Sequence, residues 1–341
     1  MDFRSMDGEY RGYVSGHDPM FEFLRRVLAE RLGVTHPHPA FRVFALTGSA
    51  EVYRYEEKST GTQVICKFYG NKYGWDRDRA AALVRQEYQS LRTLRGYGLA
   101  GSPHHVVRPL ALDVDINCVL AMEYYRGEPL SRAISRGIGH GEHDHLYWRL
   151  TALAYFLATQ HRRTANGIGV DFQVDASYLR HVVRRSQRAG RMGQGDADEF
   201  NWLSDQWRDR SVMWQDQEVW LHGDATPANF LFGSGLDAAA VDLERMRRGD
   251  RMFDVGRVAG ELQHASMSMT GDRHRAEPFI GHFLWEYSCH FPDREGTFAS
   301  ITRRLPYYMG LNLLRIAAND YVGDDYRHRL LRQGKELLRA H

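Results

Sequence analysis

The spacing of apolar residues first predicts a block of β-strands between residues 41 and 123. Apolar and polar residues alternate there, with glycine-containing turns between the first runs, and alternation with period two is typical of half-buried strands. The predicted strands are Phe41–Leu46, Glu51–Tyr55, Gln63–Phe68, Val106–Val114 and Cys118–Glu123. Helical spacing over 75–97 places one helix after the third strand. This β-β-β-α-β-β order indicates a compact lobe built on an antiparallel sheet.

Helical spacing dominates on both sides of this block. A short amphipathic helix is predicted after Asp18, a helix N-cap followed by a proline, and it ends at Gly33. Further helices are predicted at 146–161, 178–191, 196–214 and from 252 onward, interrupted by short strands at 219–221, 230–232 and 239–241. We therefore predict an α+β protein with an N-terminal helical extension (1–40), an N-lobe of sheet and helix (41–126) and a mainly helical C-lobe (127–341), joined by a hinge near 123–127.

Composition and charge narrow the class of protein. The chain of 341 residues contains no apolar run near the roughly 20 residues that span a bilayer. It begins Met1-Asp2-Phe3-Arg4, without the apolar region of a secretory signal, so we expect a cytoplasmic protein. A net charge of +2 makes no case for a nucleic-acid or membrane partner. The cysteines, Cys66, Cys118 and Cys289, are too widely spaced for a zinc site and too few for a disulfide framework.

The strongest chemical signal is a polar loop between two apolar β segments, Leu221 to Phe232. Asp224 and Asn229 lie five positions apart in that loop, and Asp242 ends the next predicted strand. Phosphoryl transfer needs a carboxylate that accepts a hydroxyl proton, and oxygen ligands that hold Mg²⁺ against the phosphates. The alternative interpretation is a pair of turn-stabilising residues beside an unrelated strand.

At these residues the chain resembles the aminoglycoside phosphotransferase and choline kinase family, relatives of the protein kinases. His222-Gly223-Asp224 and Asn229 match the family's HGDxxxxN loop, and Asp242-Leu243-Glu244 matches its metal-binding step. The resemblance implies a bilobal protein-kinase-like fold. It also implies ATP or GTP as phosphoryl donor, Asp224 as the catalytic base, and Asn229 and Asp242 as magnesium ligands.

The same resemblance predicts a nucleotide site in the N-lobe. Lys67 lies in Val64-Ile65-Cys66-Lys67-Phe68, a strand similar to the kinase V-A-I-K strand, and would face the α- and β-phosphates. Glu87 on the following helix is the expected ion-pair partner of Lys67. Taken alone, each could be an ordinary solvated charge.

Two further segments complete the expected nucleotide site. Gly48 and Ser49 occupy the position of the phosphate-covering loop, where an ordinary hairpin turn fits equally well. Met122, Glu123 and Tyr125 resemble the interlobe hinge, where Met122 would line the adenine pocket. There the Glu123 carbonyl and the Tyr125 N–H would read the edge of the base.

Three other polar residues are expected to have structural roles. Asp254, in a segment that resembles the family's G-D-x-x-x-D step, would cap a helix or brace the catalytic loop. His222 would hydrogen-bond the backbone, and His161 would pack in the core.

The acceptor is expected to be a small molecule with a hydroxyl group. Gly223 stands where protein kinases carry arginine, and no A-P-E segment follows Asp242-Leu243-Glu244. Aminoglycosides, amino alcohols, amino acids and sugars all fit. The sequence leaves the acceptor, the nucleotide preference and the oligomeric state open. It keeps two alternative functions, a catalytically silent nucleotide-binding protein and an arginine-rich nucleic-acid-binding protein. The balanced net charge and the lack of a clustered basic run disfavour the second.

The charge of the acceptor is also open. A cationic acceptor would use carboxylates and an anionic acceptor would use arginines. The candidate carboxylates are Glu244, Glu261, Asp320 and Asp324, and the candidate arginines are Arg245, Arg247 and Arg248.

Overall fold

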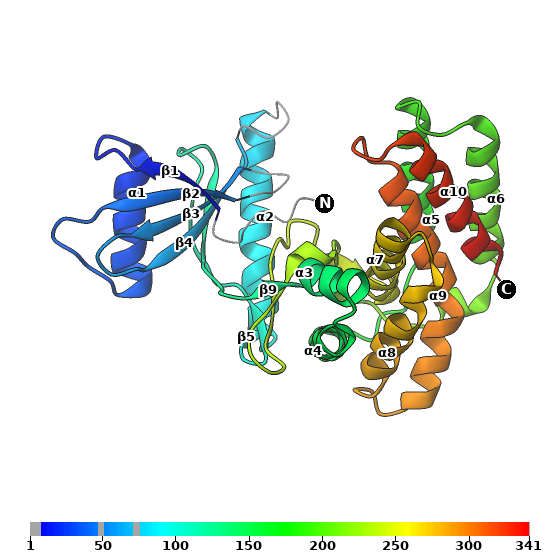
Figure 1. The fold of residues 1–341 in the computed structure, drawn as a ribbon. Helices are drawn as coiled ribbons and strands as arrows, with labels where there is room; N and C mark the ends of the chain where they lie inside the picture. Colours follow the sequence, from blue (N-terminus) through cyan, green and yellow to red (C-terminus); the bar gives the residue numbers. More distant parts are fainter. Residues whose placement is uncertain (1–7, 47–50, 71–75, 341) are drawn as a thin grey trace. The chain divides into compact units, whose positions relative to one another are not determined.

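The computed structural model describes residues 8–46, 51–70 and 76–340, and the chain divides into two compact units. The first unit holds the residues up to 126 together with 239–244, and the second holds 127–238 and the residues from 245 onward. Figure 1 shows the elements of both units in chain order. Within the described ranges, no helix has both the length and the apolar character needed to cross a bilayer.

The first unit is built on a six-stranded antiparallel sheet with the order β1-β2-β3-β4-β8-β7. Its strands are β1 (Glu9–Tyr13), β2 (Phe41–Leu46), β3 (Glu51–Glu57), β4 (Gln63–Phe68), β7 (Pro109–Asp113) and β8 (Val119–Glu123). Its other elements are α1 (Pro19–Val27), a π-helical turn (Leu28–Leu32), α2 (Arg77–Gly96) and the hairpin of β5 (Ala100–Gly101) and β6 (His104–Val106). The predicted α+β fold with an antiparallel N-terminal sheet is confirmed.

The described residues before β2, from residue 8 onward, pack within this unit, in the segment that the sequence analysis set apart as an N-terminal extension (1–40). β1 pairs with β2 along the sheet edge. The buried face of α1, which includes Phe23 and Leu24, joins the hydrophobic core that also contains Val64 and Cys66 of β4. Burial of large apolar side chains stabilises this packing by about 1.5–3 kcal/mol each. The sequence did not indicate β1, because this short strand is largely exposed and interrupted by a bulge.

β4 presents opposite chemistry on its two faces, because successive side chains of a strand point in opposite directions. Val64, Cys66 and Phe68 belong to the hydrophobic core. Lys67 alternates with them and lies in register with Val52 of β3 and Leu120 of β8. An ammonium group is therefore fixed on the second face of a central strand.

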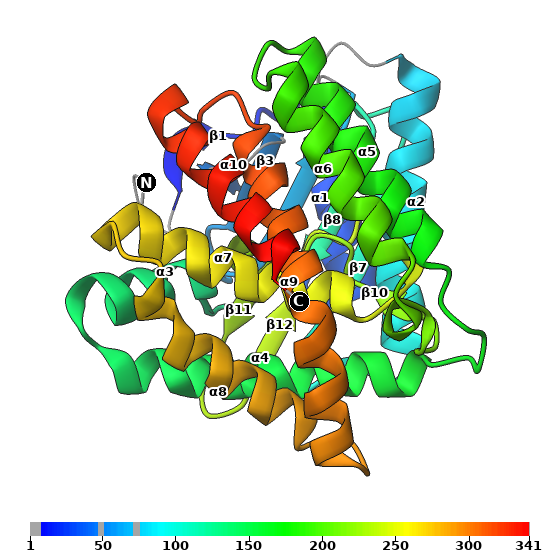
Figure 2. The ribbon, with the colours of Figure 1, turned by 90° about the vertical axis from the view of Figure 1, so that its right-hand side faces the viewer.

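The second unit is mainly helical. Its longer helices are α4 (His143–Thr164), α5 (Phe172–Arg188), α6 (Gln194–Arg208), α7 (Met252–Thr270), α8 (Glu277–Ser288), α9 (Arg294–Ala317) and α10 (Asp324–Arg339). Its shorter elements are β9 (Glu128–Pro129), α3 (Leu130–Ile134), β10 (Val219–Leu221), β11 (Phe230–Phe232) and β13 (Arg247–Gly249), with 3₁₀ turns at Ser211–Trp214, Pro227–Asn229 and His274–Ala276 and a π-helical turn at Ser135–Gly139. α9 packs against α7 and α10, α4 packs against α8, and Figure 2 shows α10 lying along α9.

Two glycines bring α7 and α9 unusually close together. A Cβ atom added at Gly256 would lie 2.2 Å from the Cβ of Tyr308, and one added at Gly260 would lie 2.8 Å from the Asn312 side chain. Real Cβ atoms essentially never approach other atoms so closely, so a larger residue would push the helices apart. This close contact fixes the relative position of the polar side chains on α7 and α9.

The short strand that was predicted at 239–241 does not belong wholly to the helical part of the chain. β12 spans Ala238–Ala240, and the residues from 239 to 244 group with the first unit. One reason is a backbone hydrogen bond of 3.3 Å from the Val107 N–H to the Ala240 carbonyl. The segment that carries Asp242 and Glu244 is consequently described with the sheet of the first unit.

Candidate functional site

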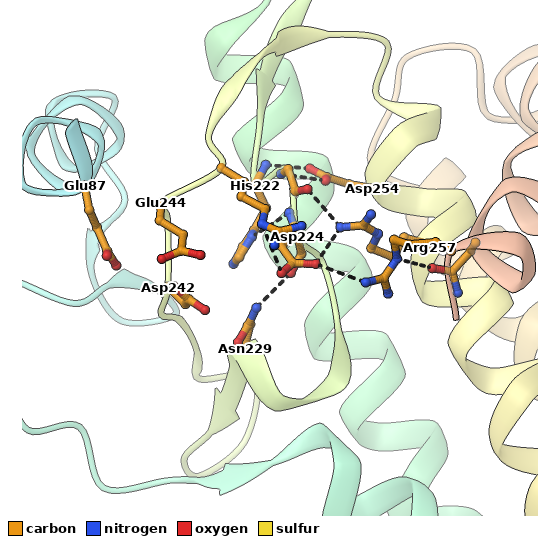
Figure 3. Close-up of polar contacts among 12 residues, drawn as sticks. Glu87, His222, Asp224, Asn229, Asp242, Glu244, Asp254 and Arg257 are labelled. Carbon is orange, nitrogen blue, oxygen red and sulfur yellow. Dashed lines mark hydrogen bonds and ion pairs between the residues drawn. The ribbon is translucent and has the colours of Figure 1, made fainter. Parts of the chain in front are cut away.

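In the first unit, three carboxylates surround the ammonium group of Lys67. Lys67 Nζ lies 2.9 Å from Glu87 Oε2, 2.5 Å from Asp242 Oδ1 and 3.1 Å from Glu244 Oε2. β4 supplies Lys67, α2 supplies Glu87, and the segment after β12 supplies both other acids. Figure 3 shows the carboxylates of Glu87, Asp242 and Glu244 gathered together. The geometry contains the Lys67–Glu87 ion pair expected from the sequence, and it adds Glu244 as a partner.

This cluster carries a surplus of negative charge. Burial disfavours the charged form of Lys67, but the three carboxylates outweigh it and raise the pKa of the ammonium group. Burial is the largest influence on Glu87 and raises the pKa of its carboxyl group, although Lys67 opposes the shift. The Tyr69 hydroxyl donates to Glu87 Oε2, whereas Glu87 Oε1 is buried without a hydrogen-bond partner in the described part of the chain. One ammonium thus faces three acids.

The acids of this cluster are suited to a hard divalent cation. One carboxylate oxygen from each of Glu87, Asp242 and Glu244 lies within 4.8 Å of the other two. The Asp242 carboxylate is 29% exposed and the Glu244 carboxylate is 14% exposed, so both are reachable from solvent. Oxygen donors of this kind are the ligands that Mg²⁺ prefers.

Asp242 also has an uncommon backbone conformation. Its φ is +62°, in the left-handed region that few residues other than glycine adopt. Such conformations cost roughly 1–3 kcal/mol and persist where the surrounding structure fixes them. Asp242 therefore combines a strained backbone with a carboxylate that contacts Lys67.

In the second unit, a buried aspartate holds the HGD loop in place. Asp254, near the start of α7, accepts hydrogen bonds from the backbone N–H groups of His222 (2.6 Å) and Gly223 (3.0 Å), as Figure 3 shows. Asp254 Oδ2 also lies 3.4 Å from Nε2 of the buried His161. Asp254 therefore braces the loop, the structural role expected from the sequence, and His161 packs in the core with a second function as a support for Asp254.

The loop turns sharply at Gly223. Its φ is +79°, and a Cβ atom there would lie 2.0 Å from the backbone oxygen of Arg245. Only glycine satisfies both demands, because L side chains strain the left-handed region and a methyl group would collide with the Arg245 carbonyl. The turn sets the direction in which the next residue, Asp224, leaves the loop.

Asp224 is held by one amide and approached by three guanidinium groups. Asn229 Nδ2 donates to the Asp224 carbonyl (2.9 Å), and Arg257 Nη1 donates to Asp224 Oδ1 (2.6 Å), as Figure 3 shows. Arg315 Nη1 and Arg245 Nε each lie 3.9 Å from the Asp224 carboxylate. Burial would raise the pKa of this carboxyl group, but the three guanidinium groups together hold it below its usual range. Asp224 is therefore a carboxylate with a fixed orientation.

Arg257 and Arg315 are the site residues that the sequence prediction missed. Arg257 is 3% exposed and stands in an otherwise apolar turn of α7, Val255-Gly256-Arg257-Val258-Ala259. Lys67 was found through its resemblance to the kinase V-A-I-K strand, whereas the signal that could have found Arg257 is a charged residue inside an apolar run. Arg315 gives no comparable signal, since its position depends on how α9 packs against α7.

The hinge residues have defined surroundings in the first unit. The Glu123 carboxylate contacts His105 Nε2 (2.7 Å) and accepts from the backbone N–H of Arg108, while Met122 is buried. The ring of Tyr125 lies 5.3 Å from that of His105. Gly48 and Ser49 lie outside the described residues.

Comparison with known proteins now identifies the family. The sequence model of the phosphotransferase enzyme family matches residues 41–290, so the chain belongs to this family. No curated protein sequence matches the chain.

Several solved structures share the fold at low sequence identity. An ethanolamine kinase of Plasmodium vivax aligns with a TM-score of 0.60 and 12% identity, over 96% of this chain and 89% of that one. A choline kinase of Cryptosporidium parvum aligns with a TM-score of 0.62 and 10% identity, over 93% and 94% of the two chains. An amicoumacin kinase, solved with AMP-PNP, Ca²⁺ and amicoumacin, aligns with a TM-score of 0.59 and 14% identity, over 87% of each chain. These likenesses show the protein-kinase-like fold of the small-molecule kinases.

Proposed function

We propose that this protein transfers the γ-phosphoryl group of ATP, or of GTP, to a hydroxyl group of a small molecule. The observation that carries the proposal is the ion cluster around Lys67. Lys67 and Asp242 are 175 positions apart in the sequence, yet Asp242 Oδ1 lies 2.5 Å from Lys67 Nζ. Kinases need an ammonium for the nucleotide phosphates and a carboxylate for the metal, and this cluster supplies both kinds of group.

Magnesium fits the residues available. In this proposal Asp242 and Asn229 are its ligands, and Glu244 contributes a further carboxylate beside Asp242. The surplus negative charge around Lys67 favours a divalent cation, and the bond from Asn229 to the Asp224 carbonyl uses only the amide nitrogen of Asn229. When bound, the metal would neutralise the charge of the nucleotide phosphates. The amicoumacin kinase solved with AMP-PNP and Ca²⁺ has the same fold, which supports a nucleotide and a divalent ion here.

The protein's own residues would divide the remaining work. Lys67, oriented by Glu87, would bind the phosphates of the nucleotide as a point charge. Asp224 would accept the proton of the acceptor hydroxyl, because its carboxylate is ionised and its direction is fixed by Arg257. Met122, Glu123 and Tyr125 would bind the base, and Gly48 and Ser49 would cover the phosphates. The cytoplasm remains the expected location.

A screen for nucleotide consumption tests this function. The wild-type protein is incubated with Mg²⁺, ATP or GTP, and a panel of aminoglycosides, amino alcohols, amino acids and sugars, and release of the nucleoside diphosphate is measured. We expect at least one acceptor to be phosphorylated, and Asp224→Asn to lower kcat about 10²–10⁴-fold.

Asp209→Asn is the matched control, since Asp209 is an exposed aspartate of the same unit with a side chain 74% accessible. It should keep wild-type turnover. A wild-type protein that binds Mg–ATP but phosphorylates no acceptor in the panel would favour the alternative, a catalytically silent nucleotide-binding protein.

A further inference from the structure

The carboxylates that a cationic acceptor would use are already engaged. Glu244 Oε2 lies 3.1 Å from Lys67 Nζ in the first unit. In the second unit, Glu261 Oε1 accepts a hydrogen bond of 2.8 Å from Arg315, and Asp324 pairs with Arg327. Of the candidates raised by the sequence, only the exposed Asp320 is left without a described partner.

Two of the candidate arginines are also engaged. Arg247 Nη2 donates to the buried Asp175 (2.6 Å), and its guanidinium lies over the ring of Phe253. Arg248 Nη1 donates to the carbonyl of Thr164 (2.6 Å), and its guanidinium lies over the ring of Trp220. Both side chains hold the second unit together. The arginines close to Asp224 are instead Arg245, Arg257 and Arg315.

Arg257 has hydrogen-bonding capacity that the protein leaves unused. Both of its hydrogen bonds, to Asp224 Oδ1 (2.6 Å) and to the Gly223 carbonyl (2.9 Å), are made by Nη1. Its Nε and Nη2 make no hydrogen bond to a described residue, and both are reachable from solvent, although the residue as a whole is only 3% exposed. An oxyanion that reaches these donors would form charge-assisted hydrogen bonds with them.

Arg315 offers a second donor beside the same carboxylate. Its Nε donates to Asn312 Oδ1 (3.2 Å) and its Nη2 donates to Glu261 Oε1 (2.8 Å). Its Nη1, 3.9 Å from Asp224 Oδ1, makes no hydrogen bond to any residue that the structure describes. The guanidinium groups of Arg257 and Arg315 thus both approach the carboxylate of Asp224, and each keeps donors that bond no described residue.

We propose that the acceptor carries an oxyanion, a carboxylate or a phosphate, which Arg257 and Arg315 bind beside Asp224. The inference rests on the proposed phosphotransferase function and names the class of its acceptor. The bound oxyanion would give the unused guanidinium donors a hydrogen-bond acceptor. It would also place a neighbouring hydroxyl group of the acceptor molecule at Asp224.

The transfer step balances with these residues. The acceptor hydroxyl gives its proton to Asp224 Oδ2, since Oδ1 is occupied by Arg257. The hydroxyl oxygen forms a bond to the γ-phosphorus of the nucleotide. The bond from that phosphorus to the β,γ-bridging oxygen breaks, and its electron pair leaves with the nucleoside diphosphate.

Four acceptors with one scaffold test the inference. Glycerol, glycerate, glycerol 3-phosphate and 3-amino-1,2-propanediol share vicinal hydroxyl groups on a three-carbon chain and differ in the third substituent. We expect kcat/KM for glycerate or glycerol 3-phosphate to exceed that for the neutral and cationic compounds by about tenfold or more. If glycerol or the amino diol is the better substrate, the phosphotransferase function stands and the inference falls.

Variants separate acceptor binding from a role in the transfer step. Arg315→Met should raise KM for the anionic acceptors about tenfold or more beyond any change in KM for glycerol. Arg332→Gln is the control, because Arg332 is exposed on α10 and has no ion pair within the described part of the chain. An equal fall of kcat for all four compounds, with KM unchanged, would show that Arg315 acts on the transferred phosphoryl group and would overturn the inference.

A binding measurement gives a readout that does not depend on turnover. Inorganic phosphate is titrated calorimetrically into protein that is already saturated with Mg²⁺ and AMP-PNP. We expect the wild type and Arg332→Gln to bind phosphate and Arg315→Met to bind it about tenfold more weakly. Absence of phosphate binding to the wild type would contradict the inference, even if every compound of the turnover series is inactive.

Discussion

The two units of the molecule each surround one charged group with several groups of the opposite sign. In the first unit, the ammonium of Lys67 contacts three carboxylates, those of Glu87, Asp242 and Glu244. In the second unit, the carboxylate of Asp224 lies within 4 Å of three guanidinium groups. The first cluster is therefore rich in carboxylates and suits a metal cation, whereas the second is rich in guanidinium groups, which suit an anion. The signs indicate different ligands for the two units.

Loss of the central charge of the first cluster should give the largest change in stability. Lys67→Met leaves three carboxylates without their shared cation, and removing one partner of a buried ion pair costs about 3–5 kcal/mol. Urea unfolding should show this loss for Lys67→Met, whereas the exposed Lys58 at the β3–β4 turn should tolerate the same change. Equal stability of the two variants would mean that the cluster does not hold the sheet and α2 together.

A substitution of Gly223 should give the next largest loss of stability, and it tests the second unit. Gly223→Ala forces a methyl group against the Arg245 carbonyl, so we expect a loss of about 2–4 kcal/mol and of most turnover. Gly235→Ala is a matched control, since Gly235 also has a positive φ but no atom within 4 Å of an added Cβ. It should cost only about 1 kcal/mol in backbone strain. Similar losses in both variants would exclude the close contact as the cause.

These features differ in how far the sequence could predict them. Lys67 and Glu87 were predicted from the resemblance of their strand and helix to the family's nucleotide site. Asp254 was predicted from the resemblance of its segment to the family's G-D-x-x-x-D step. The left-handed backbone of Asp242 and the contact of Gly223 with Arg245 depend on segments that meet only in the folded chain.

The grouping of arginines around Asp224 shows the same limit more clearly. It arises because Gly256 and Gly260 let α9 approach α7, which brings Arg315 to Asp224. No spacing within either helix encodes that contact. The sequence named three arginines next to the metal-binding step. Arg245 approaches Asp224, whereas Arg247 and Arg248 serve packing in the second unit. In the first unit, the largely exposed β1 escaped prediction because its few residues carry little apolar pattern.

A substitution of Asp254, which braces the HGD loop, should have a smaller effect on stability, and this effect should depend on pH. Asp254→Asn replaces one of two acceptor oxygens by an amide donor that faces a backbone N–H, so we expect a loss of about 1–3 kcal/mol. Burial opposes the charge of Asp254, but His161, His222 and the backbone N–H groups outweigh it and lower the pKa of its carboxyl group.

The sign of the pH dependence follows from that shift. A carboxyl group with a lowered pKa in the folded state stabilises the protein above its unfolded pKa of about 3.9, and this stabilisation is lost as the pH falls through the folded value. Thermal unfolding of the wild type and of Asp254→Asn should therefore converge in acid. A difference in melting temperature that does not shrink as the pH falls below about 3.9 would contradict the assignment.

Removing one surplus carboxylate should have the smallest effect on stability. Glu244→Gln leaves Lys67 with two partners and removes repulsion among the acids, so without metal we expect stability within about 1 kcal/mol of wild type. Titration with Mg²⁺ and AMP-PNP should show weaker binding, by about tenfold. Unchanged nucleotide binding would remove Glu244 from the proposed metal site.

The central claim, that the two clusters serve different steps, is tested most directly by measuring turnover and Mg–AMP-PNP affinity in the same two variants. We predict that Asp224→Asn lowers kcat about 10²–10⁴-fold and changes the nucleotide Kd less than about twofold. Asp242→Asn should instead raise that Kd about tenfold or more. If Asp224→Asn weakens nucleotide binding as much as Asp242→Asn does, or if both variants keep wild-type turnover, the division of roles is wrong.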